Sequence, residues 1–206
     1  MKRAITIDDL FRIKLLANPQ IAPDGEQVVF VCKWIDAEKN KYFSNLWRVR
    51  IGEEAQPFTY GEWSDSRPRW SPDGKQIAFV STRQKPKTQL YVIAADGGEA
   101  RPITNLEEGS IGDFAWSPDG TRIAFTYRET APEWREAARK ERQEKGLSNP
   151  PRIIRRAYWR LDGDGAFVDQ RYHLYVVDVR TGETKQLVAD PEFSESCPVW
   201  SPDGTQ

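Results

Sequence analysis

The sequence predicts an all-β fold: a partial β-propeller with three four-stranded antiparallel blades and the first strand of a fourth. One observation is a recurring phrase, Trp-Ser-Pro-Asp-Gly, at 70–74, 116–120 and 200–204, with a divergent form, Ile-Ala-Pro-Asp-Gly, at 21–25. Another is its spacing. The second positions of the first three copies are 49 and 46 residues apart, near the period of roughly 40–50 residues for four-stranded propeller blades.

The phrase itself predicts a tight turn between two strands. Proline presets φ at the first central position, aspartate can bond its own backbone, and glycine accepts a positive φ. An apolar run begins at the third residue after the glycine in each of the first three copies. These runs are 28–31, 77–80 and 123–126. The turn therefore joins the first two strands of each blade.

Two further strands complete each repeat. Apolar stretches lie at 46–49, 90–93 and 174–177, polar turns at 52–54, 97–99 and 181–183, and short final runs at 57–59, 102–104 and 186–188. Each repeat therefore supplies four strands. We expect Trp70, Trp116 and Trp200 to occupy equivalent positions, and likewise Phe30, Phe79 and Phe125.

The repeat also sets the expected boundaries. A single incomplete propeller domain is predicted over 1–206. It consists of an N-terminal helical segment at 1–18, blade one at 19–60, blade two at 66–105, blade three at 111–190 and the start of blade four at 196–206.

The N-terminal segment shows helical features. A helix is predicted from Thr6 to Ala17, because Thr6 can cap it and the acidic residues 8 and 9 favour a first turn. Apolar residues at 10, 13 and 16 fall on one face. The helix is expected to end near Asn18-Pro19, because the residue before a proline disfavours helical geometry.

The third blade carries an insertion. Ser117 and Ser201 are 84 residues apart, 38 more than the preceding spacing. This places about 38 extra residues at about 128–165, between the second and third strands, by analogy with insertions in other repeats. Within it the sequence predicts a surface helix at 131–145, a strand from Ile153 to Leu161, and a hairpin turn at Asp162-Gly163-Asp164-Gly165.

Composition excludes several classes of function. The chain has 206 residues, 38% hydrophobic and 30% charged, which predicts a soluble globular protein. Its net charge of −1 gives no electrostatic reason to expect nucleic acid as a partner. No signal peptide or membrane span is evident, so a cytoplasmic location is the default expectation. No cofactor is predicted.

The two cysteines, Cys32 and Cys197, fall in apolar surroundings of different repeats. Two reduced, buried thiols are favoured over a disulfide.

Two features of the sequence could suggest a metal or catalytic site. Asp162-Gly163-Asp164-Gly165 suggests calcium, but the fifth, sixth and twelfth positions of the loop are Ala166, Phe167 and His173 where an oxygen ligand, a glycine and a glutamate are required. A hairpin turn is favoured, and no metal site is predicted. His173 is the sole histidine, and a strand histidine on a blade surface is favoured over a catalytic base.

No catalytic residue is predicted. The chain contains no Gly-x-Ser-x-Gly elbow, no phosphate-binding glycine loop and no Cys-x-x-Cys pair. Basic residues gather in the insertion at Arg152, Arg155, Arg156 and Arg160. A solvated strand face is favoured over an anion site there, and the substrate-binding residues stay unknown.

The repeat phrase followed by Ile-Ala-Phe resembles two groups of propellers. One is TolB and its relatives. The other is the N-terminal propeller of prolyl-oligopeptidase-type serine peptidases, especially the acylaminoacyl-peptidase and dipeptidyl-peptidase branch. The opening at 7–10 and 18–25, the insertion end at 156–165 and the strand at 173–179 resemble that branch, whereas the export signal and α/β domain that precede the repeats in TolB are missing.

The resemblance implies a two-domain enzyme. In that family a propeller of seven or eight blades caps a C-terminal α/β-hydrolase domain that carries a Ser, Asp and His triad, and it restricts entry to short or unstructured peptides. The resemblance therefore implies that this chain is an N-terminal fragment, inert alone, of a peptidase for short or N-acylated peptides. A non-catalytic TolB-like binding module is the alternative.

Neither the triad nor the groups that grip a peptide terminus can be assigned by motif. Glu133 and Glu136 are possible terminus-binding residues, although solvated helix residues are the favoured interpretation. The isolated chain is expected to self-associate through its open blade faces, because unpaired strands and apolar patches find partners.

Overall fold

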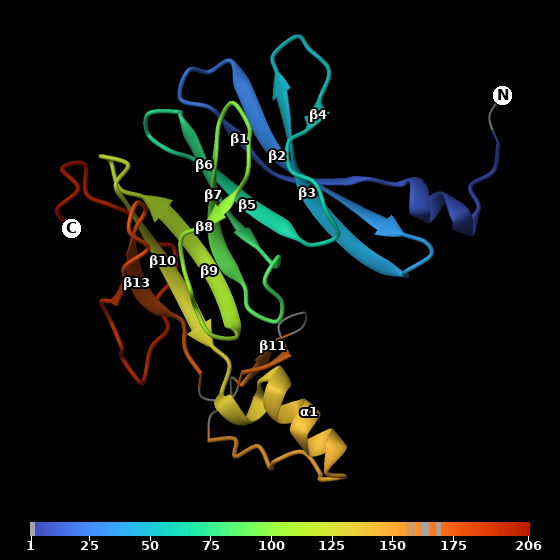
Figure 1. Ribbon diagram of the computed structural model, residues 1–206, viewed down its shortest axis with the longest axis vertical. Coiled ribbons are helices and arrows are strands. Elements are labelled where there is room, and N and C mark those ends of the chain that lie inside the picture. Colours follow the sequence, from blue (N-terminus) through green and yellow to red (C-terminus); the bar gives the residue numbers. More distant parts are fainter. Residues whose placement is uncertain (1–2, 156, 158, 162–164, 168–169) are drawn as a thin grey trace. The chain divides into compact units, whose positions relative to one another are not determined.

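We describe a computed structural model of the chain, covering residues 3–155, 157, 159–161, 165–167 and 170–206. The chain divides into two compact units. One consists of 1–84 with 89–103, and the other of 85–88 with 104–206. Three four-stranded antiparallel sheets account for most of the regular structure (Figure 1). The predicted partial propeller of four-stranded blades is confirmed.

The first unit holds two of these sheets, in the order β1-β2-β3-β4 and β5-β6-β7-β8. Blade one consists of β1 (Leu15–Ile21), β2 (Gln27–Asp36), β3 (Lys41–Arg50) and β4 (Gln56–Pro57). Blade two consists of β5 (Asp65–Trp70), β6 (Gln76–Ser81), β7 (Gln89–Ala94) and β8 (Arg101–Pro102).

The second unit holds the third sheet, in the order β14-β13-β10-β9. Its strands are β9 (Gly109–Trp116), β10 (Arg122–Glu129), β13 (His173–Asp178) and β14 (Thr184–Gln186). The insertion lies between β10 and β13 in the sequence. It contains the short strands β11 (Arg160–Leu161) and β12 (Gly165–Ala166), which are not part of this sheet.

Strand register repeats from sheet to sheet. Phe79 on β6 lies opposite Tyr91 on β7, and Phe125 on β10 lies opposite Tyr175 on β13. The ring centroids are 5.8 Å and 5.5 Å apart in these two stacked pairs. Phe30 lies opposite a tryptophan at the same point of blade one. The phenylalanines therefore hold one position of the repeat, as the sequence predicts.

The turn of each complete phrase is closed by its serine. The Ser71 hydroxyl donates to the Asp73 carboxylate at 2.6 Å and accepts from the Gln76 N–H at 2.9 Å. The same pair of bonds recurs at Ser117 and at Ser201. Aspartate and serine together fix the chain reversal that the sequence predicted from proline, aspartate and glycine alone.

The tryptophan of the phrase binds the preceding repeat. The Trp70 Nε1–H donates to the Gln20 carbonyl at 3.1 Å, and the Trp200 Nε1–H donates to the Ala115 carbonyl at 3.1 Å. Both acceptors lie one residue before the tryptophan position of their own repeat. The two bonds are therefore equivalent, and each ties a repeat to the innermost strand of its neighbour.

A residue with a positive φ recurs three residues before this tryptophan position. Asn18, Arg67 and Cys197 stand there with φ of 50°, 52° and 50°, and each precedes a proline. The strand pairing shifts by one residue at the first two of these points. A bulge lets an innermost strand bend more sharply than regular pairing allows.

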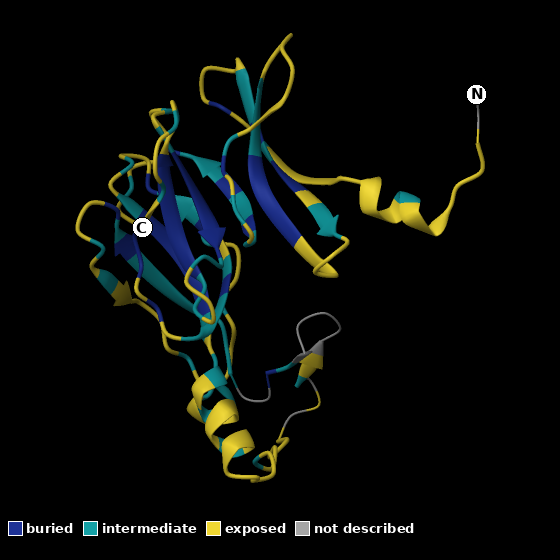
Figure 2. Cartoon of the chain, turned by 45° about the vertical axis from the view of Figure 1, so that its right-hand side comes forward, coloured by how far each residue is buried: buried dark blue, intermediate teal, exposed yellow. Residues whose placement is uncertain are grey.

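The core of the first unit lies between its two sheets. Val29 and Val31 of β2 and Leu46 of β3 pack in one cluster with Ile77 and Phe79 of β6. All five are buried, and the central strands of the sheets are the most buried parts of the chain (Figure 2). Burial of apolar side chains of this size stabilises a fold by about 1.5–3 kcal/mol each.

A polar network is buried beside this core. The Asp65 carboxylate is fully buried and accepts hydrogen bonds from the Thr59 hydroxyl at 2.7 Å, the Ser81 hydroxyl at 2.6 Å and the Arg83 Nη2 at 2.9 Å. The Thr59 hydroxyl accepts in turn from the Leu46 N–H. These bonds connect β3 of blade one, the segment that follows β4, and blade two. They also satisfy the carboxylate charge of Asp65, which would otherwise be costly to bury.

The N-terminal helix prediction is wrong over most of its length. Only a 3₁₀ helix, η1 (Ile7–Arg12), forms, and residues 15–21 form strand β1. The apolar residues Leu10, Ile13 and Leu16 are 51%, 51% and 67% exposed. A helix presenting this face would have nothing to pack against, and short helices need tertiary packing. Pairing with β2 satisfies the backbone instead, so blade one begins before residue 19.

The insertion is less regular than predicted. It contains a 3₁₀ turn η2 (Pro132–Trp134), helix α1 (Glu136–Glu144), and the two-residue strands β11 (Arg160–Leu161) and β12 (Gly165–Ala166), which pair with each other. No strand covers 152–155, where Pro150-Pro151 precedes the segment and removes two backbone donors. The turn residues 162–164 lie outside the described residues.

The expected first strand of blade four, at 197–200, does not form as a strand. A strand needs a hydrogen-bonded partner, and no described strand pairs with these residues. The turn has nevertheless begun, because the Ser201 N–H donates to the Gln206 carbonyl at 2.7 Å. Among the described residues, no helix is long and apolar enough to cross a membrane.

Candidate functional site

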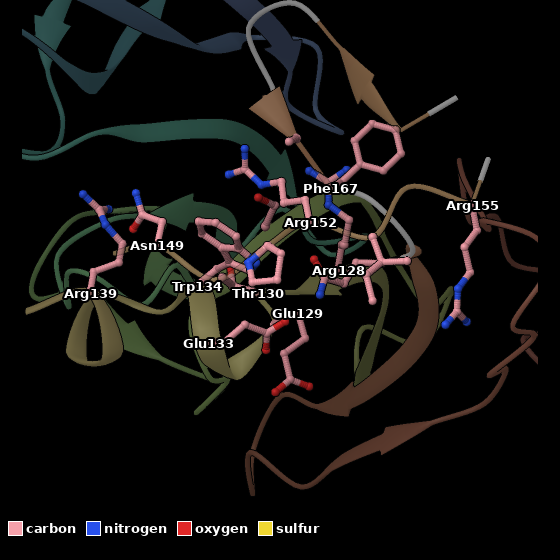
Figure 3. A pocket seen from close by; sticks show the side chains of 16 residues that line it. Arg128, Glu129, Thr130, Glu133, Trp134, Arg139, Asn149, Arg152, Arg155 and Phe167 are labelled. Atoms are coloured by element: carbon pink, nitrogen blue, oxygen red, sulfur yellow. The ribbon is translucent and has the colours of Figure 1, made fainter. Parts of the chain in front are cut away.

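The insertion of blade three and the end of β10 enclose a basic pocket of about 680 Å³. Four arginines line it, Arg128 on β10, Arg139 on α1, and Arg152 and Arg155 on the segment after the helix. Trp134 and Asn149 also line it, and Figure 3 shows Arg139 and Arg155 toward opposite sides of the view, with Trp134 and Arg152 between them. The volume falls within the range of ordinary ligand pockets.

The pocket exists because the insertion is fixed to its own blade. The Arg135 guanidinium pairs with the Glu129 carboxylate, lies 3.5 Å from the Glu107 carboxylate, and donates from Nε to the Thr130 carbonyl at 3.2 Å. The Glu108 carboxylate accepts from the Glu136 N–H at 2.7 Å. That N–H belongs to the first turn of α1, where a carboxylate also meets the positive end of the helix dipole.

Aromatic faces hold two of the arginines. The Arg152 guanidinium lies 4.1 Å from the centroid of the Trp134 ring. The Arg128 guanidinium lies 5.0 Å from the Phe167 ring and 4.7 Å from the Tyr172 ring. When a guanidinium lies flat over an aromatic ring, its N–H groups point outward in the guanidinium plane and can still donate to an acceptor.

The charge of the pocket is not balanced within the described part of the chain. Arg139, Arg152 and Arg155 are exposed, and their guanidinium groups have no hydrogen bond or ion pair with another described residue. Of the two lining carboxylates, Glu129 is neutralised by Arg135, and Glu133 stands without an ion pair among the same residues. The lining therefore carries excess positive charge and can attract an anion.

Comparison with known proteins places the chain in a family. The family model described as PD40, TolB beta propeller domain, matches residues 12–149. The chain belongs to this family. The match covers blades one and two and continues through α1, so the pocket arginines at 152 and 155 lie beyond it.

Two relatives of this TolB-type propeller carry peptidase names. The chain is 36% identical over 206 residues to "Uncharacterized peptidase YuxL" of Bacillus subtilis, covering 99% of the chain and 30% of the relative. It is 28% identical to dipeptidyl-peptidase 5 of Porphyromonas endodontalis, over 52% of the chain and 16% of the relative. The chain thus spans about a third or less of the length of these curated relatives.

Among solved structures, an acylaminoacyl peptidase of Pyrococcus horikoshii has a similar fold. The TM-score is 0.66 at 18% identity, over 86% of this chain and 25% of that one. The resemblance to propellers of the TolB and acylaminoacyl-peptidase groups is confirmed.

The two glutamates suggested as terminus-binding residues separate in this TolB-type propeller. Glu133 lines the pocket. The Glu136 carboxylate pairs with Lys140 at 2.5 Å, and this hydrogen bond lowers the pKa of Glu136. Of the two, only Glu133 is placed to meet a ligand of the pocket.

The predicted arginine cluster is only partly brought together. Arg152 and Arg155 line the pocket from an irregular segment, so the expected strand face is wrong at these positions. Arg160 lies on β11 and is exposed, and Arg156 lies outside the described residues. The sequence did not single out Arg128 and Arg139, because they lie on β10 and α1, which precede the arginine-rich segment that begins at Arg152.

His173 and the two cysteines are the remaining candidates. His173 is half-buried on β13, with Nδ1 3.2 Å from the Glu195 carboxylate. No group of potential ligands among the described residues could hold a metal ion. Cys32 is buried, which raises its pKa, whereas Cys197 is exposed, contrary to expectation. Cys197 lies outside regular structure, three residues before Trp200.

Proposed function

We propose that this chain is the N-terminal propeller portion of a serine peptidase that acts on short or N-acylated peptides in the cytoplasm. The observation that carries the proposal is the 36% identity to a named peptidase across 99% of the chain, which accounts for 30% of that relative. The resemblance of the opening and of the insertion to the acylaminoacyl-peptidase branch supports the same reading.

In this proposal the propeller is a cap and a gate. The nucleophile lies in a C-terminal α/β-hydrolase domain of the same parent chain, because these 206 residues hold no Gly-x-Ser-x-Gly elbow. The blade cores are buried and neighbouring repeats are joined by hydrogen bonds, so the propeller should be rigid. A rigid propeller that covers the reacting serine can exclude folded proteins from it.

Active-site labelling of the full-length parent tests the proposal. A fluorophosphonate probe should label one serine of the parent, and the labelled peptide should lie outside these 206 residues. The parent should hydrolyse an acetyl-alanine chromogenic substrate, and this chain alone should not, because it lacks an activated nucleophile. A parent that neither takes the label nor turns over the substrate would refute the proposal.

A TolB-like binding module is the second candidate. It is favoured by the family match itself, which describes a TolB propeller over 12–149. In that case the parent would contain further blades and no serine hydrolase domain, so the same labelling experiment separates the two functions.

A further inference from the structure

We propose that the basic pocket of the insertion binds a carboxylate of a peptide, supplied either by its C-terminus or by an acidic side chain. The choice of a peptide as ligand rests on the proposed function, whereas the choice of a carboxylate rests on the pocket alone. The pocket has a volume of about 680 Å³ and three exposed arginines whose guanidinium groups have no hydrogen-bond or ion-pair partner among the described residues.

Arg152 is the central binding group. Its guanidinium is held 4.1 Å from the Trp134 ring centroid, so its plane is positioned before a ligand arrives. None of its N–H groups is used by another described residue. A planar fork of free donors matches the two oxygens of a carboxylate, and such bidentate, charge-assisted hydrogen bonds are among the strongest available.

The surroundings of Trp134 add further positive charge. The Arg142 guanidinium lies 5.9 Å from the same ring, and its buried Nε and Nη2 atoms have no hydrogen-bond acceptor among the described residues. Arg139 and Arg155 line the same pocket from two different segments. An anion that enters the pocket therefore meets cations on more than one side.

Glu133 provides the opposing charge. It lines the pocket without an ion pair among the residues that the structure describes. A peptide carboxylate would be repelled by it, so its removal should strengthen binding while removal of an arginine weakens it. Opposite effects from two neutralising substitutions in one pocket are not expected of a general loss of structure.

Isothermal titration calorimetry on the full chain provides the test. The probe is acetyl-tetraalanine with a free C-terminus, and the control is the same peptide with a C-terminal amide. A third peptide carries one aspartate and an amidated C-terminus. Binding of the first peptide alone identifies the C-terminus as the source of the carboxylate, and comparable binding of the third identifies an acidic side chain. Equal binding of all three, or no binding, overturns the proposal.

Substitutions then locate the site. Arg152→Gln should weaken binding of the carboxylate peptide by about tenfold or more, and Glu133→Gln should tighten it. Arg180→Gln, at an exposed position near the end of β13, is the matched control and should leave binding unchanged. Circular dichroism should show unchanged folding in all three, because these side chains are exposed. Binding unaffected by Arg152→Gln would overturn the proposal.

The test is independent of catalysis, since it measures binding without hydrolysis. Failure of the chain to bind the peptide would refute carboxylate binding by the pocket and would leave the proposed peptidase function unaffected. Peptide binding, together with a parent that is not a serine hydrolase, would refute the peptidase function and leave carboxylate binding unaffected. Raising the ionic strength should weaken binding in every variant that retains Arg152, since exposed charges are screened by salt.

Discussion

Asp65 is the residue on which the first unit depends most for its polar interior. Its carboxylate is fully buried and is satisfied by two hydroxyls and the Arg83 guanidinium, whose side chain is 17% exposed. Arg83 in turn lies over the Trp63 ring at 4.8 Å. Removal of the carboxylate leaves an uncompensated cation against an aromatic cluster.

We therefore expect Asp65→Ala to lower the free energy of unfolding by about 3–5 kcal/mol, the usual cost of breaking a buried pair. Urea denaturation followed by circular dichroism measures this. Asp96→Ala, in the exposed turn after β7, is the control and should change stability by about 0.5 kcal/mol or less. Similar losses for the two variants would show that the network contributes little.

The aspartates of the repeated turn give the fold a dependence on pH. The Ser117 hydroxyl, followed by the Thr121 N–H, lowers the pKa of Asp119 from 3.8 to about 2. The pKa values of Asp73 and Asp203 are lowered in the same way, chiefly by Ser71 and Ser201. A depressed folded-state pKa stabilises the fold above the unfolded value, and that stabilisation is lost as pH falls.

Acid should therefore weaken the turns as pH falls from 3.8 toward about 2. Between these values the urea midpoint should decrease more steeply for the native chain than for Asp119→Asn, which cannot titrate at this position. Parallel pH profiles for the two proteins would contradict the role assigned to this carboxylate.

At this scale the sequence predicted part of the turn and none of the network. Proline, aspartate and glycine identify the reversal, whereas the hydrogen bonds of the serine between tryptophan and proline become evident only in the structure. Asp65 could not be predicted, because its carboxylate partners come from two separate segments, at Thr59 and at 81–83, and the corresponding position of blade three is Ile111. Comparing the repeats identifies the residues that all blades share, but it does not identify a residue such as Asp65 whose role is specific to one blade.

At the scale of elements, neighbouring repeats are joined through the tryptophan of the phrase. The Trp70 Nε1–H reaches the Gln20 carbonyl on β1, whereas the buried Trp63 Nε1–H has no partner among the described residues. The chain thus supplies a matched pair of indoles that differ in this one bond.

We expect Trp70→Phe to destabilise the first unit more than Trp63→Phe, by about 1 kcal/mol from the hydrogen bond. Both substitutions keep an aromatic ring and remove one indole N–H. Thermal unfolding of the two variants measures the difference. Equal losses would mean that the tryptophan of the phrase acts through its ring alone.

The elements most open to prediction were those fixed by local spacing. The second and third strands of each blade were located from their apolar runs, because alternation and turn residues lie within a few positions. The segment at 15–17 was misassigned, since only pairing with β2 makes it a strand. The pocket could not be predicted from the sequence either. It depends on the ion pairs of Arg135 with Glu107 and Glu129, which hold the insertion against its blade.

At the scale of the whole molecule, large apolar side chains are exposed near the first and last copies of the phrase. Ile21, the first residue of the divergent copy, is 68% exposed, and Val199, which precedes the last copy, is 84% exposed. Apolar patches on a protein surface tend to find partners, and an open sheet edge invites pairing with another chain.

We therefore expect the isolated chain to dimerise or to form a higher oligomer. Light scattering on a size-exclusion column should report a mass above that of one chain, and Val199→Lys should shift the population toward monomer. A clean monomer at micromolar concentration would contradict this expectation.

The most direct test of the proposed role as cap and gate is the size dependence of cleavage by the full-length parent. We predict that the parent hydrolyses an acetylated tripeptide and leaves a stably folded protein, such as native ribonuclease A, uncut under the same conditions. The propeller in the proposal excludes the folded substrate from the reacting serine. Cleavage of the folded protein with a kcat/KM comparable to that of the tripeptide would contradict the proposed role.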